Sequence, residues 1–154
     1  MKLRTDIPPT SIPATVDSSF LQTLVGYNTR RATLTILDVF TQRMGPLGLS
    51  VVEFSILSLI GRNPGLTPSQ LCAELGLLPP NLTKLLARLD QRKWVERRVP
   101  AADKRAVCLS LSEAGAELLA RAEPEAVALE IDATSALTAR QRETLISLLQ
   151  KGYR

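Results

Sequence analysis

The sequence of 154 residues contains no histidine and only two cysteines, so the side chains that most often bind metals or transfer protons are scarce. It has no Cys-x-x-Cys pair, no glycine-rich phosphate loop and no pair of carboxylates beside a candidate nucleophile. Catalysis therefore lacks obvious groups, and an enzyme is the less favoured class. We predict no catalytic residue, no metal site and no cofactor.

Long apolar runs are also absent. No stretch approaches the ~20 apolar residues needed to span a bilayer, and no apolar block follows Lys2 and Arg4, as a secretory signal would require. Cys72 and Cys108 fit a reducing compartment with both thiols free, and the simplest interpretation of both is a small buried hydrophobe. We therefore expect a cytoplasmic protein that does not enter a membrane.

What the sequence has instead is a local excess of positive charge. The whole chain has a net charge of +4, yet residues 81–111 alone hold eight Lys or Arg and only three Asp or Glu. From residue 112 onward, seven acidic residues outnumber five basic ones. A protein that lays one face on phosphates segregates its charge in this way, whereas a uniformly solvated surface does not.

The N-terminal part divides into an arm and a helix. Residues 1–16 hold three prolines among polar side chains, and we interpret them as a flexible or polyproline-like arm. A first helix is predicted to begin near residue 17 and to run to about Met44, where a Gly-Pro pair ends it. Its apolar positions change face around Arg30 and Arg31, which indicates two sets of neighbours.

Three capping boxes mark further helix starts, at residues 50–53, 67–70 and 138–141. The helix after the first box is apolar enough to be the central element of the core. The helix after the second box is short, and Gly76 fits the left-handed position that follows its last turn. Together these signals predict a helix-turn-helix in the middle of the chain.

The second helix of this motif is predicted to have an apolar and a polar face. Because a residue before proline avoids the helical region, we place Pro79 outside the helix and Pro80 at its first position, with an end near Trp94. The double proline is either a simple rigid start or a means of stiffening the tip of the helix. Four leucines at helical spacing face inward (Leu82, Leu85, Leu86 and Leu89), which leaves Asn81, Thr83, Lys84, Ala87 and Arg88 facing outward.

Two strand-like runs, residues 95–99 and 106–111, flank a charged loop and are predicted to form an antiparallel hairpin. We expect Trp94 to pack between helix and hairpin rather than to hold a ligand. A helix sized for the major groove beside a basic loop that can reach the minor groove is typical of proteins that read duplex DNA. A long helix capped by Ser112 follows, which Pro124 is expected to bend or break.

The most specific run is Asp103-Lys104-Arg105-Ala106, followed by Leu-Ser-Leu-Ser-Glu-Ala-Gly at residues 109–115. With Leu75-Gly76-Leu77 and the run Val95-Glu96-Arg97-Arg98, it resembles the MarR family of bacterial transcriptional regulators. The resemblance covers residues 17–154 and implies a fold that is mainly α with a small β-wing. It implies a winged helix-turn-helix at about residues 47–111 and dimerisation helices at about 17–45 and 112–154.

The resemblance also implies a function. Members of this family are sequence-specific regulators that bind near-palindromic double-stranded DNA as homodimers, and we expect a repressor released by a small-molecule effector. Arg105 matches the wing-tip arginine that enters the minor groove, and Asp103 matches the acid that orients it. The chain departs from the family pattern at Leu78, where a capping serine is common, and at Lys93, where glycine is common. The candidate DNA contacts are Pro80, Asn81, Thr83, Lys84, Arg88, Arg98, Asp103, Lys104 and Arg105.

Simpler interpretations stand beside these. Asp103 could be an ordinary turn residue, and Arg98 could be solvated or face a phosphate rather than read a base. Arg30 and Arg31 could hold an anionic effector, or they could form a solvated break in the first helix. A winged helix used only for protein contacts is the remaining alternative, and the basic cluster argues against it.

Overall fold

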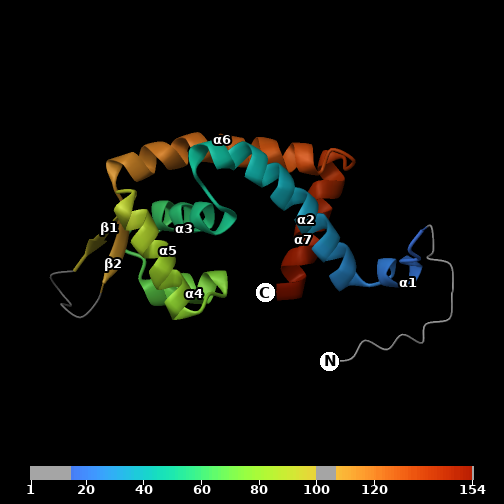
Figure 1. The fold of residues 1–154 in the computed structure, drawn as a ribbon, viewed down its shortest axis with the longest axis horizontal. Helices are drawn as coiled ribbons and strands as arrows, with labels where there is room; N and C mark the ends of the chain where they lie inside the picture. Colours follow the sequence, from blue (N-terminus) through green and yellow to red (C-terminus); the bar gives the residue numbers. More distant parts are fainter. Residues whose placement is uncertain (1–14, 100–106, 154) are drawn as a thin grey trace, which may run out of the picture. The chain divides into compact units, whose positions relative to one another are not determined.

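The computed structural model describes residues 15–99 and 107–153, which form a mainly helical fold (Figure 1). The chain divides into two compact units, Met1–Leu34 and Thr35–Arg154. The elements follow one another as α1 (Ser19–Gln22), α2 (Val25–Met44), the 3-10 turn η1 (Gly45–Leu47), α3 (Val51–Arg62), α4 (Pro68–Leu75), α5 (Pro79–Gln91), β1 (Val95–Arg98), β2 (Cys108–Leu111), α6 (Glu113–Ala133) and α7 (Ala139–Tyr153). The predicted fold class, mainly α with a small β-wing, is confirmed.

The first unit corrects one prediction. A single helix was expected from residue 17 to Met44, but the helix is interrupted between α1 and α2. At the break, Thr23 Oγ1 donates to the carbonyl of Phe20 at 2.7 Å, and Asn28 Nδ2 donates to the carbonyls of Gln22 and Leu24, each at 2.8 Å. Side chains of this kind compete with the helical hydrogen bonds, and here they end one helix before the next begins.

The second unit is organised around α3. Its capping box is complete, because the Ser50 side chain accepts from the Glu53 backbone and the Glu53 side chain accepts from the Ser50 backbone. Three apolar side chains of α3, Ile56, Leu57 and Ile60, are at most 1% exposed. α4, β2 and α6 all pack against α3 (Figure 1), so the central place expected for this helix is confirmed.

A bend or a break was expected at Pro124, and the break is wrong, because α6 runs without interruption past this residue. Proline removes one backbone hydrogen bond, but packing on both sides of it holds the helix together. Leu118 and Leu119 precede Pro124, Leu129 follows it, and all three are buried in the core. Ion pairs add to this packing, since Arg62 lies 2.9 Å from Glu123 and Arg43 contacts both Glu125 and Asp132.

The last helix, α7, is capped as the sequence predicted. Thr138 N donates to Gln141 Oε1 at 2.9 Å, and Gln141 N donates to Thr138 Oγ1 at 3.3 Å. No residue of α7 is buried within the part of the chain that the structure describes. Across the described ranges, no individual helix has the length and apolar character to cross a membrane, although α2–η1 and α3 taken as a bent pair meet that criterion by length and composition alone.

Candidate nucleic-acid interface

The helix-turn-helix is built from α4 and α5. The Thr67–Gln70 box caps α4, and Gly76 ends it in the left-handed conformation, with φ 62°. The amide of Leu77 then donates to the carbonyl of Cys72 at 3.0 Å, which closes the turn. Leu71 and Leu82, one from each helix, are at most 1% exposed. The sequence therefore predicted the turn correctly from one capping box and one glycine.

The start of α5 differs from the prediction by one residue. Pro79, not Pro80, is the first helical residue, and the extended Leu78 precedes it without a side-chain cap. Two prolines fit here because the first amides of a helix have no intrahelical partner to lose. The tip of α5 is consequently apolar and poor in N–H donors, and Leu78 is 69% exposed.

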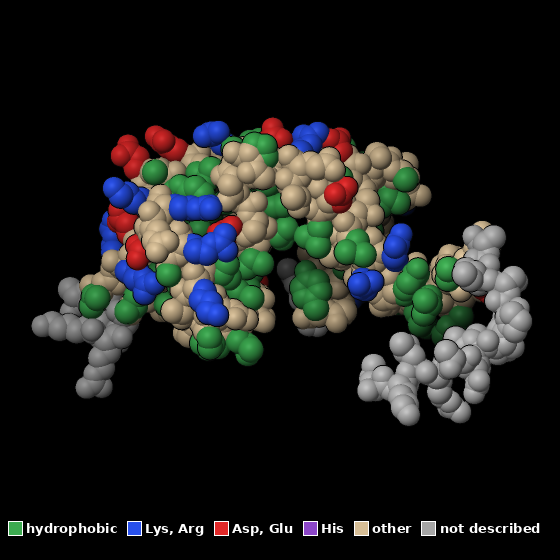
Figure 2. All heavy atoms as spheres, in the orientation of Figure 1, with side chains coloured by type: hydrophobic (Ala, Val, Ile, Leu, Met, Phe, Trp, Pro, Cys, Tyr) green, Lys and Arg blue, Asp and Glu red, His purple; other side chains and the backbone are tan. Residues whose placement is uncertain are grey.

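The outer face of α5 matches the prediction. Asn81, Thr83, Lys84, Ala87 and Arg88 are all exposed, whereas Leu82, Leu86 and Leu89 are buried and Leu85 is half-buried. Thr83 Oγ1 donates to the carbonyl of Pro79 at 2.9 Å, so its hydrogen is used inside the helix. Figure 2 shows Lys and Arg side chains gathered over α5. This face has the exposure and charge that a phosphate-rich ligand requires.

Two arginines near the C-terminal end of α5 are anchored to the start of α3. Arg88 Nη2 lies 3.0 Å from Glu53 Oε1. Arg92 Nη1 donates to the carbonyl of Gly48 at 2.6 Å, and its guanidinium carbon lies 4.8 Å from the centre of the Trp94 ring. Sequence reasoning placed Arg88 on the outer face but missed both anchors, because each joins residues about forty positions apart.

Glu53 is the buried charged residue of the described core, with 1% exposure. Burial alone would raise the pKa of its carboxyl. Hydrogen bonds from the Ser50 side chain and backbone, and the positive charges of Arg88 and Arg92, outweigh burial and hold the pKa below its ordinary value. The carboxylate therefore stays charged at neutral pH, which is the state that an ion pair with Arg88 needs.

The wing begins as predicted. β1 and β2 pair antiparallel, with Arg97 opposite Leu109 and Arg98 opposite Cys108. An isolated bridge also pairs Leu66 with Leu109, so a residue of the α3–α4 connection lies on the other side of β2. Arg98 Nη2 donates to Glu96 Oε2 at 3.1 Å, and both side chains are exposed. The predicted wing-tip residues Asp103, Lys104 and Arg105 lie outside the described residues.

With this geometry in place, comparisons with known proteins identify the family. The sequence model of the MarR family matches residues 47–106. The structure is similar to that of the transcriptional repressor CouR bound to a 23-mer DNA duplex, with a TM-score of 0.85 and 31% identity, over 92% of this chain and 100% of that one. The chain belongs to the MarR family. It is a DNA-binding transcriptional regulator and not an enzyme, as the sequence predicted.

The chain is also similar to other bacterial transcriptional regulators. A mutant MarR from Escherichia coli complexed with operator DNA has a TM-score of 0.78 at 27% identity, over 90% of this chain and 100% of that one. An HTH-type transcriptional repressor of Mycobacterium tuberculosis is 26% identical over 127 residues, or 82% of this chain and 91% of the relative. The HTH-type transcriptional regulator PecS of Dickeya dadantii is 33% identical over 104 residues, or 66% of this chain and 63% of the relative.

The structure also explains the glycine that ends the MarR-like motif at residue 115. A Cβ atom added to Gly115 would lie 2.0 Å from the carbonyl oxygen of Trp94, too close for any side chain. Ser112 sets this approach, since its amide donates to the same carbonyl at 3.1 Å and its hydroxyl donates to the carbonyl of Lys93 at 2.5 Å. The motif therefore packs the start of α6 against the turn at Lys93 and Trp94 that follows α5, and Gly115 lies at this junction of α5 and α6.

Lys93 occupies the position where the MarR family commonly has glycine, and it adopts the left-handed conformation, with φ 58°. Its amide donates to the carbonyl of Asp90 at 2.8 Å, and the amide of Trp94 donates to the carbonyl of Leu89 at 3.0 Å. This pair of bonds is the Schellman pattern that ends helices. The helix therefore stops at Gln91 rather than near Trp94, which corrects the predicted end.

The two arginines considered for an effector, Arg30 and Arg31, lie on α2 in the first unit, and both are exposed. Their role in binding an effector stays a prediction. In the described part of the chain, no group of three or more His, Cys, Asp or Glu residues is placed to hold a metal ion.

Proposed function

We propose that this MarR-family regulator is a repressor that binds a near-palindromic operator as a homodimer, with α5 in the major groove. The observation that carries the proposal is the outer face of α5, where Pro80, Asn81, Thr83 and Lys84 are exposed beside one another. A recognition helix places such side chains against base edges and phosphates. The relatives CouR and MarR on DNA support the same class of ligand.

The wing completes the proposed interface. In this proposal Arg105 enters the minor groove and Asp103 orients Arg105. Lys104 is the neighbouring contact, and Arg98 contacts the DNA backbone near the base of the wing. The antiparallel pairing of β1 with β2 supports a wing at this point of the chain. The assignment of the wing-tip residues themselves rests on the resemblance of their sequence to the family motif.

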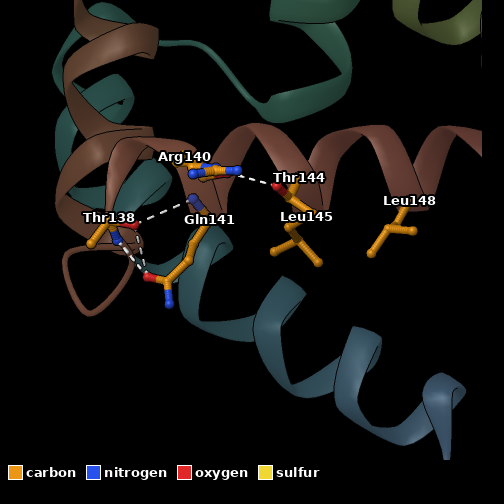
Figure 3. Close-up of a pocket in the computed structure, with 6 residues that line it drawn as sticks. All are labelled: Thr138, Arg140, Gln141, Thr144, Leu145 and Leu148. Atoms are coloured by element: carbon orange, nitrogen blue, oxygen red, sulfur yellow. Dashed lines mark hydrogen bonds between the residues drawn. The ribbon is translucent and has the colours of Figure 1, made fainter.

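The homodimer is proposed from the surface of α7. Leu145 and Leu148 line an open groove of about 350 Å³, together with Thr138 and Gln141, and they project from the same side of the helix (Figure 3). Large apolar side chains that remain exposed along a whole helix usually mark an interface. A second copy of the chain, related by two-fold symmetry, supplies both the cover for these leucines and the second recognition helix that a palindrome needs.

The proposed organisation follows the family. Residues 1–16 form the N-terminal arm, and residues 17–154 form one MarR-like domain. Within it, residues 47–111 are the winged helix-turn-helix, and residues 17–45 and 112–154 hold the dimerisation helices. The protein acts in the cytoplasm, which the two free thiols Cys72 and Cys108 support.

The proposed effector is an anionic small molecule, because Arg30 and Arg31 place two exposed cationic groups on α2. Its binding would lower the affinity of the repressor for its operator. The same two charges are the first to replace in a test of effector binding.

Selection of bound sequences from a random duplex library, at stated salt, tests the proposal. We expect enriched sites with two inverted half-sites centred about 10 base pairs apart. Lys84→Ala should then weaken binding and, if Lys84 meets a phosphate, reduce the salt slope by about one. Lys151→Ala on α7 is the matched control, since it removes the same charge away from α5.

Two results would contradict the proposal. Enrichment of a single unrepeated motif with one subunit bound would contradict both the palindromic operator and the dimer. Equal losses of affinity in the Lys84 and Lys151 variants would mean that DNA binding depends on the net positive charge of the protein and not on a contact made by α5.

A further inference from the structure

The carboxylate of Glu53 has two oxygens in different surroundings. Oε2 accepts from Ser50 N at 3.0 Å and from Ser50 Oγ at 2.7 Å, and so it makes the capping box of α3. Oε1 takes no part in the cap and makes no hydrogen bond within the described residues. What faces it is Arg88 Nη2 from the recognition helix, at 3.0 Å.

The negative charge of Glu53 is not needed for the cap. The described residues hold two other complete boxes, Thr67–Gln70 and Thr138–Gln141, and both use neutral glutamine at the third helical position. Burying a charged carboxylate where a neutral amide would suffice is unfavourable unless the charge has a partner. Arg88 is that partner.

Arg88 lies on the flank of the recognition helix rather than at the centre of its outer face. At about 100° per residue, Pro80, Lys84 and Ala87 lie opposite the buried leucines, whereas Arg88 is displaced toward the side that meets α3. Its side chain is 54% exposed, although one nitrogen is held by Glu53. A helix in the major groove has phosphate backbones on its flanks and base edges in front of its centre.

We propose that Glu53 is a positioning residue for DNA binding: it holds Arg88 on the flank of α5 so that the remaining N–H groups of the guanidinium meet a backbone phosphate. This inference rests on the proposed function. A planar guanidinium binds a phosphate through two parallel hydrogen bonds, so its orientation matters. An arginine that is already ordered loses less side-chain freedom on binding, which corresponds to an affinity gain of about threefold to tenfold.

The sign of one substitution separates positioning from simple charge. A carboxylate near phosphates repels them, so Glu53→Gln should tighten DNA binding if Glu53 contributes nothing but its charge. The glutamine keeps the capping box and the shape of the side chain. If Glu53 positions Arg88, the same substitution should instead weaken binding, by about threefold to tenfold.

The experiment measures the dissociation constant of the full chain for the operator selected with the parent protein. We expect Glu53→Gln to weaken binding, and to have no weakening effect when Arg88→Ala is already present, as a double-mutant cycle would report. Arg88→Ala alone should weaken binding to all duplexes and reduce the salt slope by about one. Asp90→Asn is the matched control, because it removes an exposed acid of the same helix that has no ion pair among the described residues, and it should leave affinity unchanged or raise it.

Three outcomes overturn the inference. Parental or tighter binding by Glu53→Gln would show that Glu53 does not position Arg88. Equal weakening by Glu53→Gln with and without Arg88 would place its effect elsewhere. If Arg88→Ala changes only the preference for one base pair of the operator, Arg88 contacts a base edge and not a phosphate. A parent chain that selects no duplex at all would instead count against the proposed function.

Arg88→Lys provides a second test if Glu53→Gln proves too unstable to assay. The lysine keeps a positive charge for Glu53 but has no second nitrogen on a planar fork. We expect the melting temperature to stay close to that of the parent while DNA binding weakens. Parental affinity in this variant overturns the inference.

Discussion

The helices α3 and α7 both carry large aliphatic side chains, but those of α3 are buried and those of α7 are exposed. In α3, Ile56, Leu57 and Ile60 are at most 1% exposed, because α4, β2 and α6 of the same chain cover them. In α7, Leu145, Ile146, Leu148 and Leu149 are between 40% and 59% exposed. Both helices carry several large aliphatic residues, and what differs is whether the chain itself supplies the cover.

The difference separates what one chain can build from what it leaves unfinished. The winged helix-turn-helix closes its own core around α3. The leucines of α7 are the kind of surface that obligate interfaces bury, resembling a core cut in half. The dimer is therefore proposed where the core of one chain is incomplete, and substitutions in the two regions should damage different properties.

The largest effect is expected from Leu145→Asp combined with Leu148→Asp in α7. Each leucine buried at an interface contributes roughly 1.5–3 kcal/mol, and two-fold symmetry doubles the loss. We expect dissociation to monomers in sedimentation, with loss of operator binding. Ser147→Asp, on the opposite side of α7, is the control and should stay dimeric. A double variant that remains a dimer would contradict the proposed interface on α7.

A smaller but still severe effect is expected from Gly115→Ala at the junction of α5 and α6. The added Cβ meets the Trp94 carbonyl at 2.0 Å, and backbone cannot move aside as a flexible side chain can. We expect a loss of about 3 kcal/mol in unfolding free energy. Gly152→Ala in α7 is the matched control, since nothing lies within 4 Å of its added Cβ. Denaturant titration of both variants measures the contrast, and equal stabilities would contradict it.

The buried carboxylate beside α3 should make stability depend on pH. Because the pKa of Glu53 is lower in the folded chain than its ordinary value of 4.5, its charge stabilises the fold above that value, and the contribution is lost as pH falls through the folded pKa. Arg88 and Arg92 are the charged groups that face it. We expect Glu53→Gln to cost about 1–3 kcal/mol at pH 7.

The difference in unfolding free energy between the parent protein and Glu53→Gln should shrink as the solution is acidified below about pH 4.5. Denaturant titrations of both proteins at several pH values provide the measurement. A difference that stays constant down to the acid limit would mean that the charge of Glu53 does not contribute. No comparable pH dependence is expected from the leucine face of α7, since leucine does not titrate.

The smallest effect is expected at Lys93, whose left-handed conformation is costly for any residue with a Cβ atom. Lys93→Gly should raise the unfolding free energy by about 0.5–1 kcal/mol, because the relief of strain exceeds the added freedom of the unfolded chain. Thermal unfolding of the two proteins measures this gain. A lower melting temperature in the glycine variant would show that the lysine side chain contributes contacts of its own.

What could be predicted from the sequence was encoded within a few residues. The capping boxes at 50–53, 67–70 and 138–141 each involve side chains three positions apart, and all were correctly located. The left-handed Gly76 is of the same local kind. Such signals survive folding because they depend only on the adjacent turn of the helix.

What could not be predicted depends on partners that are distant in the sequence. Glu53 was found as a cap, but its ion pair with Arg88 joins two elements whose approach no spacing rule gives. Gly115 was matched by resemblance, while its physical reason is a carbonyl from Trp94. The exposed candidates on α5 followed from helical periodicity, whereas the contacts that anchor Arg92 did not.

The bridge between Leu66 and Leu109 has a mechanical consequence for the wing. Leu109 is fully buried and is tied on one side to Arg97 and on the other to the segment that joins α3 to α4. The amide of Leu109 donates to the carbonyl of Leu66 at 2.8 Å, and the amide of Gly65 donates to the carbonyl of Leu109 at 3.1 Å. The base of the wing therefore cannot act as a hinge. A displacement of β2 must therefore move the segment that joins α3 to α4 with it.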